Sequence, residues 1–74
     1  MNDNAPSDAP TRVLLRRGDG MFYVREGAWT VDRQMARDFE EASRALVVAR
    51  TVHADRLEIV VRDGEGESIV LVNG

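Results

Sequence analysis

The sequence contains no cysteine and only one histidine, His53, among its 74 residues. Disulfides and Cys/His zinc sites, which stabilise many small domains, are therefore not available to this chain. A domain of this size buries only about 60% of its unfolded surface when it folds alone. We therefore expect oligomerisation to add stability.

Lysine is also absent: all ten basic residues are arginine, and 13 acidic residues give a net charge of −3. A negative chain lacks the positive field that non-specific binding to nucleic acid or to anionic membranes requires. The charge balance disfavours both classes of partner, although it leaves room for a local arginine patch.

Long apolar runs and a leader segment are missing as well. No run approaches the roughly 20 apolar residues of a transmembrane helix. No positively charged segment precedes an apolar stretch, as it does in a secretory signal. The absence of cysteine is compatible with a reducing compartment. These features predict a soluble, cytoplasmic protein without membrane attachment.

The first ten residues have no large apolar side chain after Met1, and they include Pro6 and Pro10. Such a segment buries too little surface to offset the entropy lost when a chain becomes ordered. We predict a disordered tail over residues 1–10 and a single α+β domain over residues 11–74.

Strand-like and turn-like segments alternate through most of this domain. β-Branched and aromatic residues favour strands, whereas Gly18-Asp19-Gly20, Gly27 and the four residues 63–66 favour turns. The strands are predicted over residues 12–17, 21–26, 28–33, 56–62 and 67–72.

One helix is predicted between the third and fourth strands, from Phe39 to about His53. Asp38 and Glu41 have the spacing of a capping box, and the helical period gathers apolar residues on one arc. This arc consists of Phe39, Ala42, Ala45, Leu46, Ala49, Val52 and His53. Its alanines would let the helix lie close to a sheet, with Trp29 filling the remaining volume.

The element order βββαββ predicts an α+β fold, with one helix packed on one face of a mostly antiparallel five-stranded sheet. The strand order stays open. Placing the last strand beside the first is favoured, because it keeps every pairing antiparallel. Strand alternation predicts a helix-side set made of Phe22, Val24, Trp29, Val31, Leu57, Ile59, Val61, Ile69 and Leu71.

The opposite face of the sheet is predicted to expose apolar residues bordered by charges. This candidate interaction face consists of Met21, Tyr23, Arg25, Val60, Arg62, Val70 and Val72. A sheet face turned to water usually carries polar side chains, whereas an apolar patch indicates an interaction surface. We expect a homodimer formed through this face or through a sheet edge. The simpler alternative is an exposed, twisted sheet whose valines reflect β-propensity alone.

A second hypothesis is single-stranded nucleic-acid binding. Tyr23 could share a sheet face with arginines, and surfaces of this kind stack unpaired bases. The arginines concerned are Arg12, Arg16 or Arg17, Arg25 and Arg62. The net charge and the scarcity of aromatic residues disfavour this function. Cross-strand ion pairs with Glu58 and Asp32 give the arginines a simpler role.

Neither catalysis nor metal binding is predicted. His53 lies ten residues after Ser43, too far along a helix for a serine–histidine pair. The loop at residues 63–67 lacks the twelve-residue spacing of an EF-hand. Gly18-Asp19-Gly20 lacks the third glycine and the following helix of a phosphate loop. We expect no enzymatic activity, no cofactor and a protein partner of unknown identity.

The middle of the chain carries Phe-Tyr-Val at 22–24, Gly-Ala-Trp-Thr-Val at 27–31, Ala-Arg-Asp-Phe at 36–39 and Leu-Glu-Ile-Val-Val at 57–61. These segments resemble small bacterial domains of unknown function. Such domains have a hairpin ending in Gly-x-Trp-x-Val, one alanine-rich helix and a closing hairpin. The resemblance agrees with the predicted fold and implies no catalytic residues. The strand over residues 13–17 is additional to the shortest of these domains.

Overall fold

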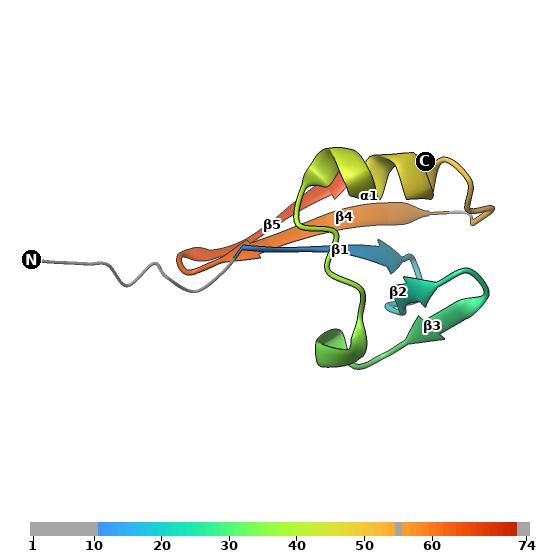
Figure 1. Cartoon of the computed structure of the whole chain (residues 1–74), viewed down its shortest axis with the longest axis horizontal. Coiled ribbons are helices and arrows are strands. Elements are labelled where there is room, and N and C mark those ends of the chain that lie inside the picture. Colours follow the sequence, from blue (N-terminus) through green and yellow to red (C-terminus); the bar gives the residue numbers. More distant parts are fainter. Residues whose placement is uncertain (1–10, 55, 73–74) are drawn as a thin grey trace, which may run out of the picture.

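A computed structural model describes residues 11–54 and 56–72. These form five strands, one 3₁₀ turn and one α-helix: β1 (Arg12–Arg17), β2 (Phe22–Arg25), β3 (Ala28–Thr30), η2 (Arg33–Met35), α1 (Ala42–Ala49), β4 (Leu57–Asp63) and β5 (Gly66–Leu71) (Figure 1). The predicted α+β fold, with one helix on a five-stranded antiparallel sheet, is confirmed. The predicted tail at residues 1–10 lies outside the described residues.

The strand order is β3-β2-β1-β4-β5, and every neighbouring pair is antiparallel. The prediction that the last strand lies beside the first is wrong, because β4 takes that position and β5 forms an edge. β4 pairs with the whole of β1, from Arg12 opposite Arg62 to Arg17 opposite Leu57. Its Ile59-Val60 pair is buried on both faces of the sheet, as a central strand requires.

The helix begins later than its sequence pattern predicts. The Asp38 carboxylate accepts the amide of Glu40 at 2.9 Å and the amide of Val13 at 3.0 Å, and the Phe39 amide donates to the Val13 carbonyl at 2.8 Å. These bonds hold Asp38 and Phe39 against β1. Glu40 then adopts a φ of 67°, a left-handed conformation that a right-handed helix cannot include, so the helix begins after this residue. The predicted capping box is therefore wrong, and the side chain of the N-cap residue, Glu41, makes no capping hydrogen bond.

The helix also ends earlier than predicted, at Ala49. The Thr51 hydroxyl and amide both donate to the carbonyl of Val48, at 2.8 and 2.9 Å, and so satisfy a carbonyl of the last helical turn. His53 lies beyond the helix and is exposed. Of the three predicted alanines, Ala45 and Ala49 are buried, whereas Ala42, the first residue of the helix, is exposed.

Both sides of the sheet carry a small core. On the side of α1, the buried cluster consists of Val13, Leu15, Phe39, Ala45, Ala49, Leu57 and Ile59. We call the other side the reverse side. Its buried cluster consists of Leu14, Phe22, Ala36 and Val60. Figure 1 shows α1 on one side of β1 and β4 and the η2 segment on the other. The reverse side is therefore partly covered, and Val60 is 0% exposed rather than part of an open face.

The register of β2 against β1 decides which aromatic residue faces the helix. Phe22 lies opposite Arg16 and belongs to the reverse-side cluster, so its neighbour Tyr23 points to the helix side. The predicted faces of Phe22 and Tyr23 are both wrong. Arg25 pairs with Ala28, and a regular ladder would then pair Val24 with Trp29. The register instead shifts between Tyr23 and Arg25, so that Trp29 lies opposite Tyr23 and on the same face.

The closing hairpin also reverses the predicted faces of β5. Its register places Val70 opposite Ile59 and Ile69 opposite Val60. Residues directly opposite each other in an antiparallel pair point to the same face. Val70 therefore lies on the helix side, whereas Ile69 and Leu71 lie on the reverse side. Val72, whose amide donates to the Leu57 carbonyl at 2.9 Å, packs against the helix-side core rather than on the reverse side.

The third strand stops at Thr30, three residues before its predicted end. The Asp32 carboxylate accepts the amide of Gln34 at 2.9 Å and so caps η2, which turns the chain away from the sheet. Val31, expected in the helix-side core, is 76% exposed as a result.

Candidate functional site

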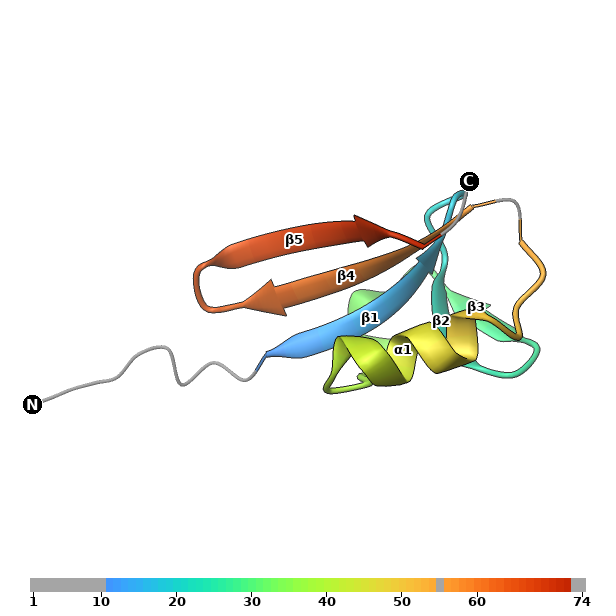
Figure 2. The same cartoon turned by 90° about the horizontal axis from the view of Figure 1, so that it is seen from above.

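The outer edge of the sheet is formed by β5, whose six residues are all exposed. Three consecutive apolar residues are about half exposed: Ile69 (49%), Val70 (52%) and Leu71 (51%). Figure 2 shows β5 running along the outer edge of the sheet, with β4 and β1 between it and α1. Within the described residues, β5 is paired with β4 alone. Apolar surface therefore lies on both faces of one edge strand.

The open edge offers backbone hydrogen-bonding groups at every second residue. The Val72 amide donates to Leu57, which makes these two residues a hydrogen-bonded pair. Hydrogen-bonded and non-hydrogen-bonded pairs alternate along an antiparallel ladder. It follows that Ser68 and Val70 direct their amides and carbonyls toward β4. Glu67, Ile69 and Leu71 direct theirs toward the open edge.

β5 lacks the features by which sheet edges usually avoid pairing with other chains. It contains no proline and no lysine, and its ladder with β4 continues without a shift from Leu71 to Gly66. The opposite edge, β3, is only three residues long, half-buried, and next to the bulge of β2. Short strands and bulges protect an edge. Among the strands that the structure describes, only β5 presents an edge open to a long regular pairing.

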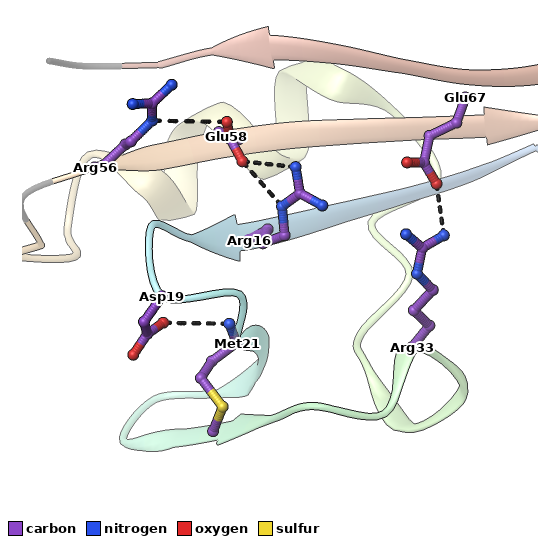
Figure 3. A network of polar contacts seen from close by, with 7 residues as sticks. All are labelled: Arg16, Asp19, Met21, Arg33, Arg56, Glu58 and Glu67. Atoms are coloured by element: carbon purple, nitrogen blue, oxygen red, sulfur yellow. Dashed lines mark hydrogen bonds and ion pairs between the residues drawn. The ribbon is translucent and has the colours of Figure 1, made fainter.

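The one charged residue of β5 is held by a partner in its own chain. Glu67 Oε1 lies 2.6 Å from Arg33 Nη1 of η2 (Figure 3). The Arg33 guanidinium also lies 5.6 Å from the Phe22 ring centroid. An unpaired charge on an edge strand opposes strand addition. Pairing with Arg33 weakens that opposition and ties η2 to the last hairpin.

A second ion-pair network crosses the middle of the reverse side. The Glu58 carboxylate accepts Arg16 Nε at 2.9 Å, lies 2.8 Å from Arg16 Nη2, and lies 3.7 Å from Arg56 Nε (Figure 3). Arg16 and Glu58 face each other across β1 and β4, as predicted. Asp32, the other predicted partner of the arginines, caps η2 instead.

The residues of the predicted interaction face do not form one surface. Val60 is buried, Tyr23 and Val72 pack toward the helix-side core, and Val70 lies on the helix side of the exposed edge. Arg62 is exposed on the reverse side, opposite Arg12. Of the remaining two, Met21 is half-buried before β2, and Arg25 is exposed beside the first hairpin turn.

Sequence reasoning missed two residues of the exposed edge, Ile69 and Leu71. The signal was present in the closing hairpin. Placing Arg62 opposite Glu67 across the predicted loop also places Val60 opposite Ile69. Residues opposite each other share a face of the sheet, so the register of the hairpin determines which side chains of β5 point to the reverse side.

A separate groove of about 570 Å³ lies between the C-terminal end of α1 and the β2–β3 hairpin. Tyr23 and Trp29 meet in it edge to face, with centroids 5.5 Å apart, and the Arg17 guanidinium lies 4.6 Å from the indole centroid. Arg17 is itself held by two bonds to Asp19, of 3.0 and 2.8 Å. The bonds from Arg17 hold the pKa of the Asp19 carboxyl below its usual value. The groove is therefore aromatic, with its nearest cation already neutralised.

His53 borders this groove and a neighbouring hollow of about 380 Å³ that also includes Arg17 and Arg56. Arg17 and Arg56 are paired with Asp19 and Glu58, respectively. Among residues 11–54 and 56–72, no group of three or more His, Cys, Asp or Glu side chains could hold a metal ion.

The structure separates Tyr23 from two of the arginines proposed for nucleic-acid binding. Tyr23 packs beside Trp29 on the helix side, whereas Arg12 and Arg16 belong to the reverse side of β1. Arg12 donates to the Ala36 carbonyl at 3.3 Å, and Arg16 is bound to Glu58. Arg12 and Arg16 therefore do not share a sheet face with Tyr23, as base stacking on a sheet requires. Arg17, the alternative to Arg16, lies over Trp29 on the side of Tyr23 and is bound to Asp19.

In comparisons with known proteins, no family model, no curated protein and no solved structure matches this chain. Within the part of the chain that the structure describes, no helix is long and apolar enough to cross a membrane.

Proposed function

We propose that this chain is a non-enzymatic protein-interaction module that associates with itself through the edge strand β5. The observation that carries the proposal is the exposure of Ile69, Val70 and Leu71 on a strand whose outer backbone groups have no neighbouring strand in the described structure. Adding a strand to such an edge forms main-chain hydrogen bonds and covers apolar side chains on both faces.

The reverse side of the sheet is a weaker candidate for the interface. Its centre is filled by Leu14, Phe22, Ala36 and Val60, which already pack against one another. Beside them, Arg16 and Glu58 are bound to each other. A partner there would meet polar groups already bound to each other, whereas a partner at β5 would meet backbone groups that no described strand pairs. We therefore propose the β5 edge, and not the reverse side of the sheet, as the interface.

Self-association also fits the physical limits of the chain. A domain of this size is only marginally stable alone, and this chain contains no cysteine for a disulfide. Two-fold association through identical surfaces is the commonest form of oligomer. A cytoplasmic location, which the cysteine-free composition permits, belongs to the same proposal.

The experiment is to measure mass by light scattering and sedimentation over a wide range of protein concentration. We expect a monomer–dimer equilibrium. Ile69→Pro removes an amide that faces the open edge and not β4, so it should weaken the dimer while sparing the fold. Val47→Lys is the matched control, because Val47 is an apolar residue of α1 that is 65% exposed. Its dimer should be unchanged.

Circular dichroism of both variants separates loss of association from loss of folding. A monomeric wild-type chain at the highest concentration would contradict the proposal. A dimer that persists in a folded Ile69→Pro variant would also contradict the proposal.

A further inference from the structure

We propose that two copies pair β5 with β5 in an antiparallel register in which Val70 lies opposite Val70 of the second copy. This inference rests on the proposed function and specifies its geometry. The result is one continuous ten-stranded sheet with a two-fold axis at Val70. The partner surface is therefore the same strand of an identical chain.

Backbone direction limits the possible registers. Glu67, Ile69 and Leu71 present their amides and carbonyls to the open edge. A symmetric antiparallel pair can be centred on one of these residues or on a residue between them. Within the last four residues of β5, the axis can therefore lie at one of four positions: Ser68, Ile69, Val70 or Leu71.

Side-chain matching selects one of these centres. Centring on Ser68 places Glu67 opposite Ile69 of the second copy, and centring on Ile69 places it opposite Leu71. Both registers bring a carboxylate against an apolar side chain. Centring on Leu71 moves Ile69 past the end of the partner strand, since β5 ends at Leu71. Centring on Val70 places Ile69 opposite Leu71 and Val70 opposite itself, so that apolar residues meet apolar residues.

The Val70 register covers both exposed faces of the edge. On the reverse side, Ile69 and Leu71 of one copy meet Leu71 and Ile69 of the other. On the helix side, the two Val70 side chains meet at the axis. Glu67 lies outside the overlap of the two strands and retains its 2.6 Å bond to Arg33. No charge is buried by the pairing.

The symmetry also places the rest of the molecule. A two-fold axis that relates neighbouring antiparallel strands is perpendicular to their sheet. Both copies of α1 consequently lie on one face of the ten-stranded sheet, and both copies of η2 lie on the other. The contact is isologous and closes after two copies, because the described strands of each chain leave only one long edge open.

A cysteine scan of β5 tests the register directly. The chain contains no cysteine, so a single introduced thiol can form a disulfide only with the same thiol of a second copy. The four variants are Ser68→Cys, Ile69→Cys, Val70→Cys and Leu71→Cys. In the proposed register, Val70 forms a non-hydrogen-bonded pair with Cα atoms about 4.5 Å apart, within disulfide range.

We expect Val70→Cys to form the disulfide-linked dimer at least about tenfold faster than the three matched variants, whose thiols face other residues of the second copy. The reaction is followed on non-reducing gels, at a protein concentration where light scattering shows the dimer. The linked Val70→Cys dimer should keep the circular dichroism of the wild type.

The outcomes separate this inference from the proposed function. Fastest linking at residue 68, 69 or 71, in a chain that is dimeric by light scattering, overturns the register and leaves self-association through β5 in place. Equal linking at all four positions also overturns the register. A wild-type monomer with no preferential linking overturns both.

Discussion

Tyr23 lies directly opposite Trp29 across β2 and β3, and their rings meet edge to face at 5.5 Å with planes 84° apart. Tyr23 also lies 5.8 Å from Phe39, which belongs to the buried cluster beneath α1. The pair therefore connects the short outer hairpin to the helix-side core. β3 has only three residues, and this contact compensates for its short ladder.

Replacing the indole tests this connection. We expect Trp29→Ala to lower the free energy of unfolding by about 2–3 kcal/mol, below the value for a fully buried tryptophan because Trp29 is half-buried. Urea denaturation followed by circular dichroism measures the change. Val31→Ala, at an exposed residue of the same region, should change stability by less than about 0.5 kcal/mol. Equal effects for both variants would show that the hairpin does not depend on the aromatic pair.

Much of the fold is readable from local sequence. Residues 12–17 form β1 as predicted, and the other four strands lie within a few residues of their predicted bounds. These elements follow from strand propensity and from turn residues such as Gly27, which has a φ of 79°. Glu40 and Arg44, four residues apart, form an ion pair of 3.2 Å. Each of these features depends on neighbours in the chain.

The faces of the strands were not readable in the same way. The register of β2 against β1 turns Phe22 to the reverse side and Tyr23 toward the helix, and the register of the last hairpin turns Ile69 and Leu71 to the reverse side. A one-residue shift exchanges every side chain beyond it. The predicted interaction face therefore contains correct strands with several residues on the wrong sides. The exposed edge emerged only once the strand order placed β5 outermost.

The start of the helix depends on a contact between distant parts of the chain. Asp38 has the sequence context of an N-cap, yet its carboxylate binds the amide of Val13, 25 positions earlier. β2 pairs with β1 only near Arg16, so the other half of β1 lacks a neighbouring strand on that side. Asp38 and Phe39 supply the missing bonds. Local sequence contains no signal for this role.

Removing the Asp38 carboxylate should cost more than its exposed position indicates. Asp38→Ala leaves the amide of buried Val13 without its acceptor, and we expect a loss of about 1–3 kcal/mol in the free energy of unfolding. Asp63→Ala is the matched control, because Asp63 also accepts an amide two residues later, but in an exposed turn. Its cost should stay below about 1 kcal/mol.

Asp38→Asn retains a side-chain oxygen that can accept the Val13 amide, so it should recover part of the lost stability. Chemical denaturation gives the free energies, and hydrogen exchange of the Val13 amide reports the bond itself. An Asp38→Ala variant with unchanged Val13 protection would show that the carboxylate is not the acceptor that matters.

The pair of Arg17 and Asp19 predicts a pH dependence at the edge of the groove. Hydrogen bonds from Arg17 lower the pKa of Asp19, since they favour its charged form. The stabilising contribution is therefore present above the unfolded value of about 3.9 and is lost as the pH falls through the lower folded pKa. Arg17→Gln should raise the Asp19 pKa toward about 3.9. Carboxyl chemical shifts recorded from about pH 2 to 6 measure both values, and an unchanged midpoint would contradict the assignment.

Backbone amide exchange in β5 distinguishes the two sides of the strand before and after association. In the monomer, the amides of Ser68 and Val70 face β4 and should exchange slowly, whereas those of Glu67, Ile69 and Leu71 face the open edge and should exchange fast.

Raising the protein concentration should then protect the amides of Ile69 and Leu71, because each would donate to the other's carbonyl in the second copy. Glu67 should stay fast, since the second β5 ends before reaching it. Protection that extends to Glu67 would indicate a register centred nearer the hairpin turn. Protection of none of the three would mean that chains meet elsewhere than at this edge.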